Sequence, residues 1–151
     1  MMQERIDLLQ EELAGLQLAA DHLAYSMQRC VALIDQAALP PEQLERLESL
    51  TSRFARLADL LIQRVFRLVD EIELTGSGSI LDRIYRAEKR GWAAAAELIK
   101  VRELRNLIAH EYATEKIQEI HAAVAALSPI LLAAAPKVIA YARKTIQRYP
   151  A

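Results

Sequence analysis

Apolar residues recur at helical spacing along almost the whole 151-residue chain. In the first 38 residues they fall at steps of three, four and seven, at Ile6, Leu9, Leu13, Leu16, Leu23, Met27, Leu33 and Ile34. This spacing is typical of a long helix with one apolar face. Only four glycines are present, too few for the many turns of an all-β chain. The sequence therefore predicts an all-α fold.

Prolines and a glycine-rich loop divide the first half of this pattern. Pro40 and Pro41 end the helix that is expected near residues 3–38, and Pro41 can occupy the first turn of a second helix. This second helix is expected to run to about Leu74. The stretch "TGSGS" at 75–79 then predicts a flexible loop.

Helix starts and breaks can also be read in the second half. Ser79 and Asp82 resemble a capping box, which predicts a short helix near 80–90. After Gly91, the pattern continues as a helix from Trp92 to about Tyr112, with Trp92 expected to anchor the junction. Thr114 and Glu115 can cap a last helix. Two prolines inside it are expected to kink or divide that helix, at Pro129 and Pro136.

The predicted architecture is an antiparallel helical bundle built on two long helices. A chain of 151 residues is the size of one domain, so residues 1–151 are expected to share one core. Helices of more than 30 residues often extend past a compact monomer. They then leave an apolar strip that a second copy can cover, which predicts a homodimer.

Charge is distributed unevenly along the chain. Residues 1–48 carry three basic and nine acidic side chains, whereas residues 49–151 carry sixteen basic and eleven acidic ones. Fourteen of the basic residues are arginines, whose planar fork suits phosphate. The later part of the chain is therefore expected to attract a polyanion.

The compartment is indicated by the cysteine and by the first residues. Cys30 has no partner cysteine in the chain, and the acidic start "MMQERIDLLQEEL" is unlike a signal peptide. The apolar run from Ala122 to Pro136 contains two prolines and is shorter than the roughly 20 residues that span a membrane. We expect a cytoplasmic protein without membrane contact, in which this run is a packed helix.

The stretch "RNLIAHEY", Arg105 to Tyr112, puts an arginine, a histidine and a tyrosine into an otherwise apolar helix. A histidine can transfer a proton near neutral pH, and an arginine can neutralise a phosphate. On a straight helix, however, Arg105 and His110 point about 140° apart. Their convergence requires a frayed or bent helix end, a long arginine reach, or two copies of the segment facing each other across a twofold axis.

The chemistry that this pair can perform is narrow. The sequence has no ligand cluster for a metal and no glycine-rich phosphate loop, so no metal and no cofactor is expected. RNA cleavage fits, because the 2′-OH of RNA is a built-in nucleophile. The structural alternative is that His110 interacts with the helix dipole, Arg105 pairs with Glu103 or another carboxylate, and Tyr112 is an edge aromatic.

The same residues resemble a known family. "RNLIAHEY" resembles the R-x-x-x-x-H-x-Y signature of HEPN domains, in the form where Asn follows Arg. The upstream "SILDRIYRAEKRGW" is similar to the segment that leads into this signature in HEPN toxins of the HepT kind. The resemblance implies an all-helical dimer with a metal-independent endoribonuclease site at the dimer interface. It also implies a toxin-antitoxin pair with a minimal nucleotidyltransferase as antitoxin, which silences the toxin by attaching AMP to the motif tyrosine.

Carried over by position, the resemblance makes Arg105 and His110 catalytic, Asn106 a polar residue that shapes the site, and Tyr112 the acceptor of AMP. HEPN domains also serve as non-catalytic, substrate-binding partners of nucleotidyltransferases. This second function, and that of a plain dimeric adaptor, remain open at this point.

Further arginines are candidate RNA contacts. Arg53, Arg56, Arg64 and Arg67 fall within about 80° of each other if the second helix is regular, and Arg102 lies close to the motif. They predict a phosphate track leading to the site. The alternative is a solvated edge whose arginine stems cover apolar surface. The remaining candidates, His22, His121 and Cys30, are expected to be packing or surface residues.

Overall fold

The computed structural model describes residues 1–76, 78–110 and 116–149, and all regular structure in these residues is helical. The all-α prediction is therefore confirmed. The elements in chain order are α1 (Met2–Cys30), η1 (Val31–Leu33), α2 (Pro41–Ala58), η2 (Asp59–Val65), α3 (Phe66–Ile72), α4 (Ile80–Lys89), α5 (Ala95–His110) and α6 (Ile117–Gln147).

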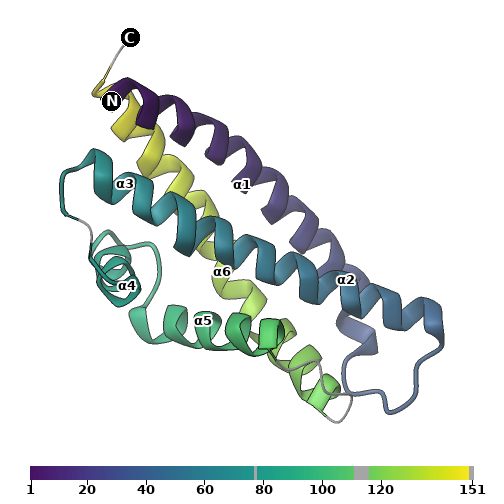
Figure 1. Cartoon of the computed structure of the whole chain (residues 1–151). Coiled ribbons are helices and arrows are strands. Elements are labelled where there is room, and N and C mark those ends of the chain that lie inside the picture. Colours follow the sequence, from purple (N-terminus) through teal and green to yellow (C-terminus); the bar gives the residue numbers. More distant parts are fainter. Residues whose placement is uncertain (77, 111–115, 150–151) are drawn as a thin grey trace.

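The long helices lie side by side, as Figure 1 shows. α1 packs against α2, and the continuous run of α2, η2 and α3 is antiparallel to α1. α6 also runs back along α1, so the end of α6 lies at the same end of the molecule as the start of α1. α4 lies beside α3, and α5 packs against α2, α4 and α6. One cluster of buried apolar side chains connects all of these helices.

The first helix is shorter than its apolar spacing predicts. α1 ends at Cys30, and a single tight turn carries the chain to Leu33. Ile34 is then extended, with ψ of 138°, and Asp35 has a φ of 71°. Neither conformation is helical, so the predicted end near residue 38 was wrong. The apolar residues at 33 and 34 instead pack in the connection to α2.

The second helix begins at Pro41, as predicted, and extends to Ile72. Its middle is a π-helix, η2, in which each turn holds more residues than an α-helical turn. The step of 100° per residue therefore does not hold across Asp59–Val65. This removes the basis for placing Arg53 and Arg56 on one stripe with Arg64 and Arg67.

The start of α4 and its junction with α5 follow the predicted signals. Ser79 and Asp82 form the capping box: the Asp82 backbone N–H donates to Ser79 Oγ at 3.2 Å, and the Ser79 N–H donates to Asp82 Oδ2 at 2.9 Å. Gly91 has a φ of 80°, which favours glycine. Trp92 is only 2% exposed and anchors the junction, as expected. α5 starts at Ala95 rather than at Trp92.

The two prolines do not divide α6, which runs as one helix from Ile117 to Gln147. Pro129 and Pro136 both lie on the exposed side, where water can bond the carbonyls that lose an N–H partner. α6 is long and apolar enough to cross a membrane by composition alone, with a mean hydropathy of 1.9 in its most apolar window. A core helix meets the same criterion, and α6 packs against α1, α2 and α5.

A buried carboxylate joins three of the helices. Asp70 in α3 is 2% exposed and accepts hydrogen bonds from Arg86 at 3.1 Å and from Arg90 at 2.6 Å, both at the end of α4 or just after it. The guanidinium of Arg90 also lies 5.2 Å from the ring centre of Trp92 and 5.6 Å from that of Tyr141 in α6. α3, α4 and α6 are thus tied together where the chain turns toward α5.

We predict that Asp70→Ala lowers the free energy of unfolding by about 3–5 kcal/mol, because it leaves the Arg90 charge buried without its main partner. Urea denaturation followed by circular dichroism measures this loss. Glu119→Gln, at an exposed carboxylate, is the control and should change stability by less than about 0.5 kcal/mol. A loss in Asp70→Ala no larger than in this control would contradict the structural role of Asp70.

Candidate active site

The motif residues lie on α5, the helix that packs against α2 and α6. Arg102 and Arg105 are half-buried, whereas Asn106 and His110 are exposed. His110 is the last residue of the helix. Tyr112, expected to accept AMP, and the predicted cap at Thr114 lie outside the described residues.

Arg105 is held by a two-point ion pair with Asp59. Its Nε donates to Asp59 Oδ1 at 2.6 Å, and its Nη2 donates to Asp59 Oδ2 at 2.9 Å. These hydrogen bonds raise the pKa of Arg105 above its ordinary value, while burial acts in the opposite direction. Arg105 therefore pairs with a carboxylate, as the structural alternative expects, but with Asp59 and not with Glu103. Its Nη1 makes no hydrogen bond to any described residue.

Asp59 is positioned by the irregularity in the second helix. It is the first residue of the π-helix η2, and its backbone N–H bonds to the carbonyls of both Ala55 and Arg56. π-helical turns change the direction in which side chains leave a helix and are frequent at functional sites. Here the carboxylate of Asp59 meets α5 at Arg105, so that the π-helix and α5 are linked.

A shallow depression surrounds this ion pair. It is lined by Ala58, Asp59, Ile62 and Gln63 from α2 and η2 and by Arg102, Arg105 and Asn106 from α5. Its volume is about 10 Å³, room for about one water molecule. A substrate phosphate would thus lie on this surface and not inside the chain. The depression brings together Arg102, Arg105 and Asn106, three of the residues singled out in the sequence.

His110 is not brought to the same point. α5 is helical through His110, so Arg105 and His110 keep the divergence of about 140° that a helix imposes on residues five apart. The guanidinium of Arg105 is directed to Asp59, on η2. Within the described residues α5 shows no frayed or bent end, and the reach of the Arg105 side chain is taken up by Asp59. The third arrangement that allows convergence, two copies facing each other, stays a prediction.

The predicted phosphate track is largely engaged with the protein itself. Arg53 donates to Ser26 Oγ at 2.7 Å, Arg64 lies 3.4 Å from Glu12, and Arg67 lies 3.8 Å from Glu71. The contacts of Arg53 and Arg64 are both with α1, whereas the depression faces α5. Arg56 is exposed and is not part of the depression.

Asp59 is the site residue that sequence reasoning missed. A signal was present, because Asp59 is the single acidic residue between Glu48 and Asp70, within the apolar run "ADLLIQRVF". A lone carboxylate among apolar helical positions needs a cationic partner. The spacing alone could not identify that partner as Arg105, which lies 46 residues further along the chain.

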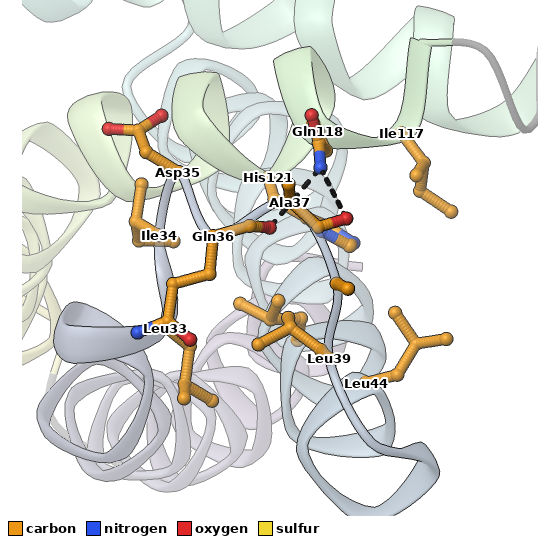
Figure 2. A pocket seen from close by; sticks show the side chains of 12 residues that line it. Leu33, Ile34, Asp35, Gln36, Ala37, Leu39, Leu44, Ile117, Gln118 and His121 are labelled. Atoms are coloured by element: carbon orange, nitrogen blue, oxygen red, sulfur yellow. Dashed lines mark hydrogen bonds between the residues drawn. The ribbon is translucent and has the colours of Figure 1, made fainter.

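A larger cavity, of about 310 Å³, lies between the connection from α1 to α2 and the start of α6 (Figure 2). Gln118 Nε2 bridges its wall by donating to the carbonyls of Gln36 and Ala37, both at 3.2 Å. His121 lines it and is 4% exposed, and burial lowers its pKa while Glu48 acts in the opposite direction. The lining includes none of the described motif residues on α5, so this cavity is separate from their site.

Comparison of the chain with models of known protein families, with characterised proteins and with solved structures gave no match. The site must therefore be interpreted from its own geometry.

We predict that Asp59 and Arg105 are energetically coupled by about 1 kcal/mol, because the contact has two points and is partly shielded from water. A double-mutant cycle with Asp59→Ala and Arg105→Ala, measured by urea denaturation, gives this coupling. The pair Asp59→Ala and Arg148→Ala is the control, because Arg148 lies beyond the end of α6 and should show no coupling. Coupling of zero in the first cycle would mean that Asp59 does not hold Arg105.

Proposed function

We propose that this chain is a metal-independent endoribonuclease toxin of the HEPN kind, acting in the cytoplasm as a homodimer. The observation that carries the proposal is the arginine of the R-x-x-x-x-H-x-Y stretch. Its guanidinium is fixed by Asp59 at the surface, next to Arg102 and Asn106, while His110 is exposed on the same helix. A purely structural ion pair does not require these additional polar neighbours.

The ion pair with Asp59 prepares Arg105 for a phosphate. Two of its nitrogens are occupied, which fixes the plane of the guanidinium, and the N–H groups of Nη1 remain available. A donor that is already oriented loses less conformational freedom when the negative charge develops in the transition state. Arg102 carries a second charge along the same depression and has no carboxylate partner among the described residues. In this proposal Asp59 is a positioning residue.

The reaction is transesterification of the RNA backbone. The 2′-oxygen attacks the adjacent phosphorus, the bond from phosphorus to the 5′-oxygen breaks, and a cyclic phosphate and a free 5′-hydroxyl result. His110 takes the proton from the 2′-OH as a base or gives a proton to the leaving 5′-oxygen as an acid, and water exchanges the other proton. Arg105 stabilises the charge on the phosphoryl oxygens. RNA supplies its own nucleophile, so the step is balanced without a metal.

The active site is proposed to be shared between two copies. Because α5 is regular through His110, one chain presents Arg105 and His110 in different directions. Two α5 helices facing each other across a twofold axis would bring Arg105 of each copy toward the imidazole of the other. The proposal includes the architecture: the helices form an antiparallel bundle of the HEPN type, and two such bundles form the dimer.

The proposed partner is a minimal nucleotidyltransferase antitoxin that attaches AMP to Tyr112. The added phosphodiester would carry a negative charge two residues beyond His110. It would compete with RNA for the arginines of the site, by the logic of phosphorylation switches. If the chain is instead a non-catalytic, substrate-binding partner of such a transferase, the purified parent protein does not cleave RNA, and expression of the chain alone does not arrest growth.

We predict that His110→Ala lowers RNA cleavage by about 10²- to 10⁴-fold and abolishes growth arrest, because it removes the proton-transfer group. Cleavage is measured with purified protein and labelled RNA, and growth with the chain expressed alone. The matched control is His22→Ala, since His22 is also an exposed histidine on a helix but lies on α1. Retained cleavage in His110→Ala, or an equal loss in both variants, would exclude the nuclease mechanism.

We predict that co-expression with the cognate nucleotidyltransferase adds AMP to Tyr112 and silences the toxin, and that Tyr112→Phe escapes this control while remaining a nuclease. A tyrosine phenol is a workable nucleophile toward the α-phosphate of ATP when a partner enzyme supplies Mg²⁺ and in-line geometry. Intact-mass spectrometry detects the adduct, and Tyr149→Phe, at an exposed tyrosine outside the motif, is the control. Silencing of the Tyr112→Phe variant without an adduct would mean that the partner acts by steric blocking.

A further inference from the structure

A second, smaller cavity lies between α1 and α2 and is lined by three arginines. We call it the arginine pocket. Its volume is about 130 Å³, and its lining consists of Tyr25, Ser26, Arg29 and Cys30 from α1 and Arg46, Ser49 and Arg53 from α2. Spacings of three and four residues place each set on one face of its helix, so the two faces oppose each other. Three hydroxyl groups and three guanidinium groups therefore meet at one place.

The positive charge of this pocket is only partly balanced. Arg53 donates only to neutral oxygens, Ser26 Oγ at 2.7 Å and the carbonyl of His22 at 3.3 Å. Arg29 lies over the ring of Tyr25, 5.5 Å from its centre. Neither arginine has a carboxylate partner in the part of the chain that the structure describes.

Arg46 is the one member of the pocket with an acidic partner. It forms an ion pair with Glu42, one turn earlier on α2. Its Nε is nevertheless buried and has no hydrogen-bond partner among the described residues. A buried donor without an acceptor is unfavourable unless a ligand or water satisfies it.

Outside the pocket, some arginines of the described chain form ion pairs with carboxylates, and others, such as Arg102, form none with a described residue. Those that form ion pairs with carboxylates outside the pocket are Arg5, Arg64, Arg67, Arg86, Arg90 and Arg105. Three guanidinium groups around one cavity with a single carboxylate are thus a local excess of positive charge. Such an excess attracts anions.

The three arginines also act on the thiol of Cys30, which lines the same pocket. Burial raises the pKa of its thiol, and Arg46, Arg29 and Arg53 act against this rise. All the charged groups that act on the thiol in this way are arginines of the pocket. The three guanidinium groups thus surround the thiol as well as the cavity.

We propose that the arginine pocket binds a phosphoryl group. Guanidinium forks and hydroxyl donors are the groups that recognise phosphate oxygens, and arginine does so at two points. The pocket is smaller than the roughly 300 Å³ at which cavities begin to enclose whole ligands, so the phosphate enters while the rest of the molecule stays outside. The phosphate belongs either to an RNA backbone or to a free phosphate ester such as a nucleotide.

This pocket is distinct from the site on α5. Arg53 contacts α1, whereas Asp59, six residues later, contacts α5. The two sites thus open on different sides of the α2–η2 helix. Binding of phosphate in the arginine pocket does not depend on RNA cleavage, and either property can fail without the other.

The test is titration of the full-length protein with inorganic phosphate at low ionic strength, followed by isothermal calorimetry and by amide NMR shifts. Saturable binding is expected, with the largest shifts in residues 25–30 and 46–53. Arg29→Gln should weaken the binding by about tenfold or more, because one charged two-point contact is lost. Arg53→Gln should do the same, and the exposed position of Arg29 keeps the test valid if the Arg53 variant does not fold.

The matched control is Arg148→Gln, which removes the same charge at the opposite end of the long helices and should leave phosphate binding unchanged. Absence of saturable binding, or an equal loss in this control, would overturn the proposal. Two further ligands distinguish the sources of the phosphate: 2′-O-methyl RNA, which cannot be cleaved, and AMP. Binding of each is measured with the parent protein and with Arg29→Gln. If Arg29→Gln weakens binding of this RNA, the backbone is the natural ligand. If it weakens only AMP and inorganic phosphate, the ligand is a free phosphate ester.

Discussion

The buried carboxylate of Asp70 is the contact on which the second half of the chain depends. It lies in α3 and is bonded by Arg86 and Arg90, so it fixes the end of α4 against the core. Arg90 in turn lies against Trp92, which closes the turn that starts at Gly91. A charge that is buried in this way has few alternative partners, and the geometry is therefore specific. The direction in which α5 leaves this junction follows from it.

α5 is then attached at a second point by another ion pair. Asp59, at the start of the π-helix, binds the guanidinium of Arg105 at two points. This contact stabilises the fold modestly because both side chains are about one third exposed. In the proposed function its larger effect is on phosphate binding, since it fixes an arginine at the surface and leaves the N–H groups of Nη1 for a phosphate. In the proposed mechanism, the exposed His110 at the end of the same helix meets such an arginine from a second copy.

The helical spacing of the sequence predicted most of the helices but not the places where they depart from a regular α-helix. Apolar spacing and Pro41 predicted the second helix, and Ser79 with Asp82 predicted the start of α4. The π-helix leaves no mark in the apolar spacing, so the stripe of arginines across it could not be placed. The candidate site could be predicted where its residues lie close together in the sequence, as for Arg105 and Asn106 on α5. Asp59 and the arginine pocket depend on contacts between distant segments, which periodicity does not report.

The shared site is tested most directly by mixing two inactive variants, Arg105→Ala and His110→Ala, after unfolding and refolding them together. If each site takes its arginine from one copy and its histidine from the other, every mixed dimer contains one intact site. RNA cleavage should then return to about one quarter of the parent activity, since about half of the dimers are mixed and each has one of two sites. Light scattering confirms the dimer mass. Absence of cleavage in a mixture that contains mixed dimers would contradict a site built from two chains.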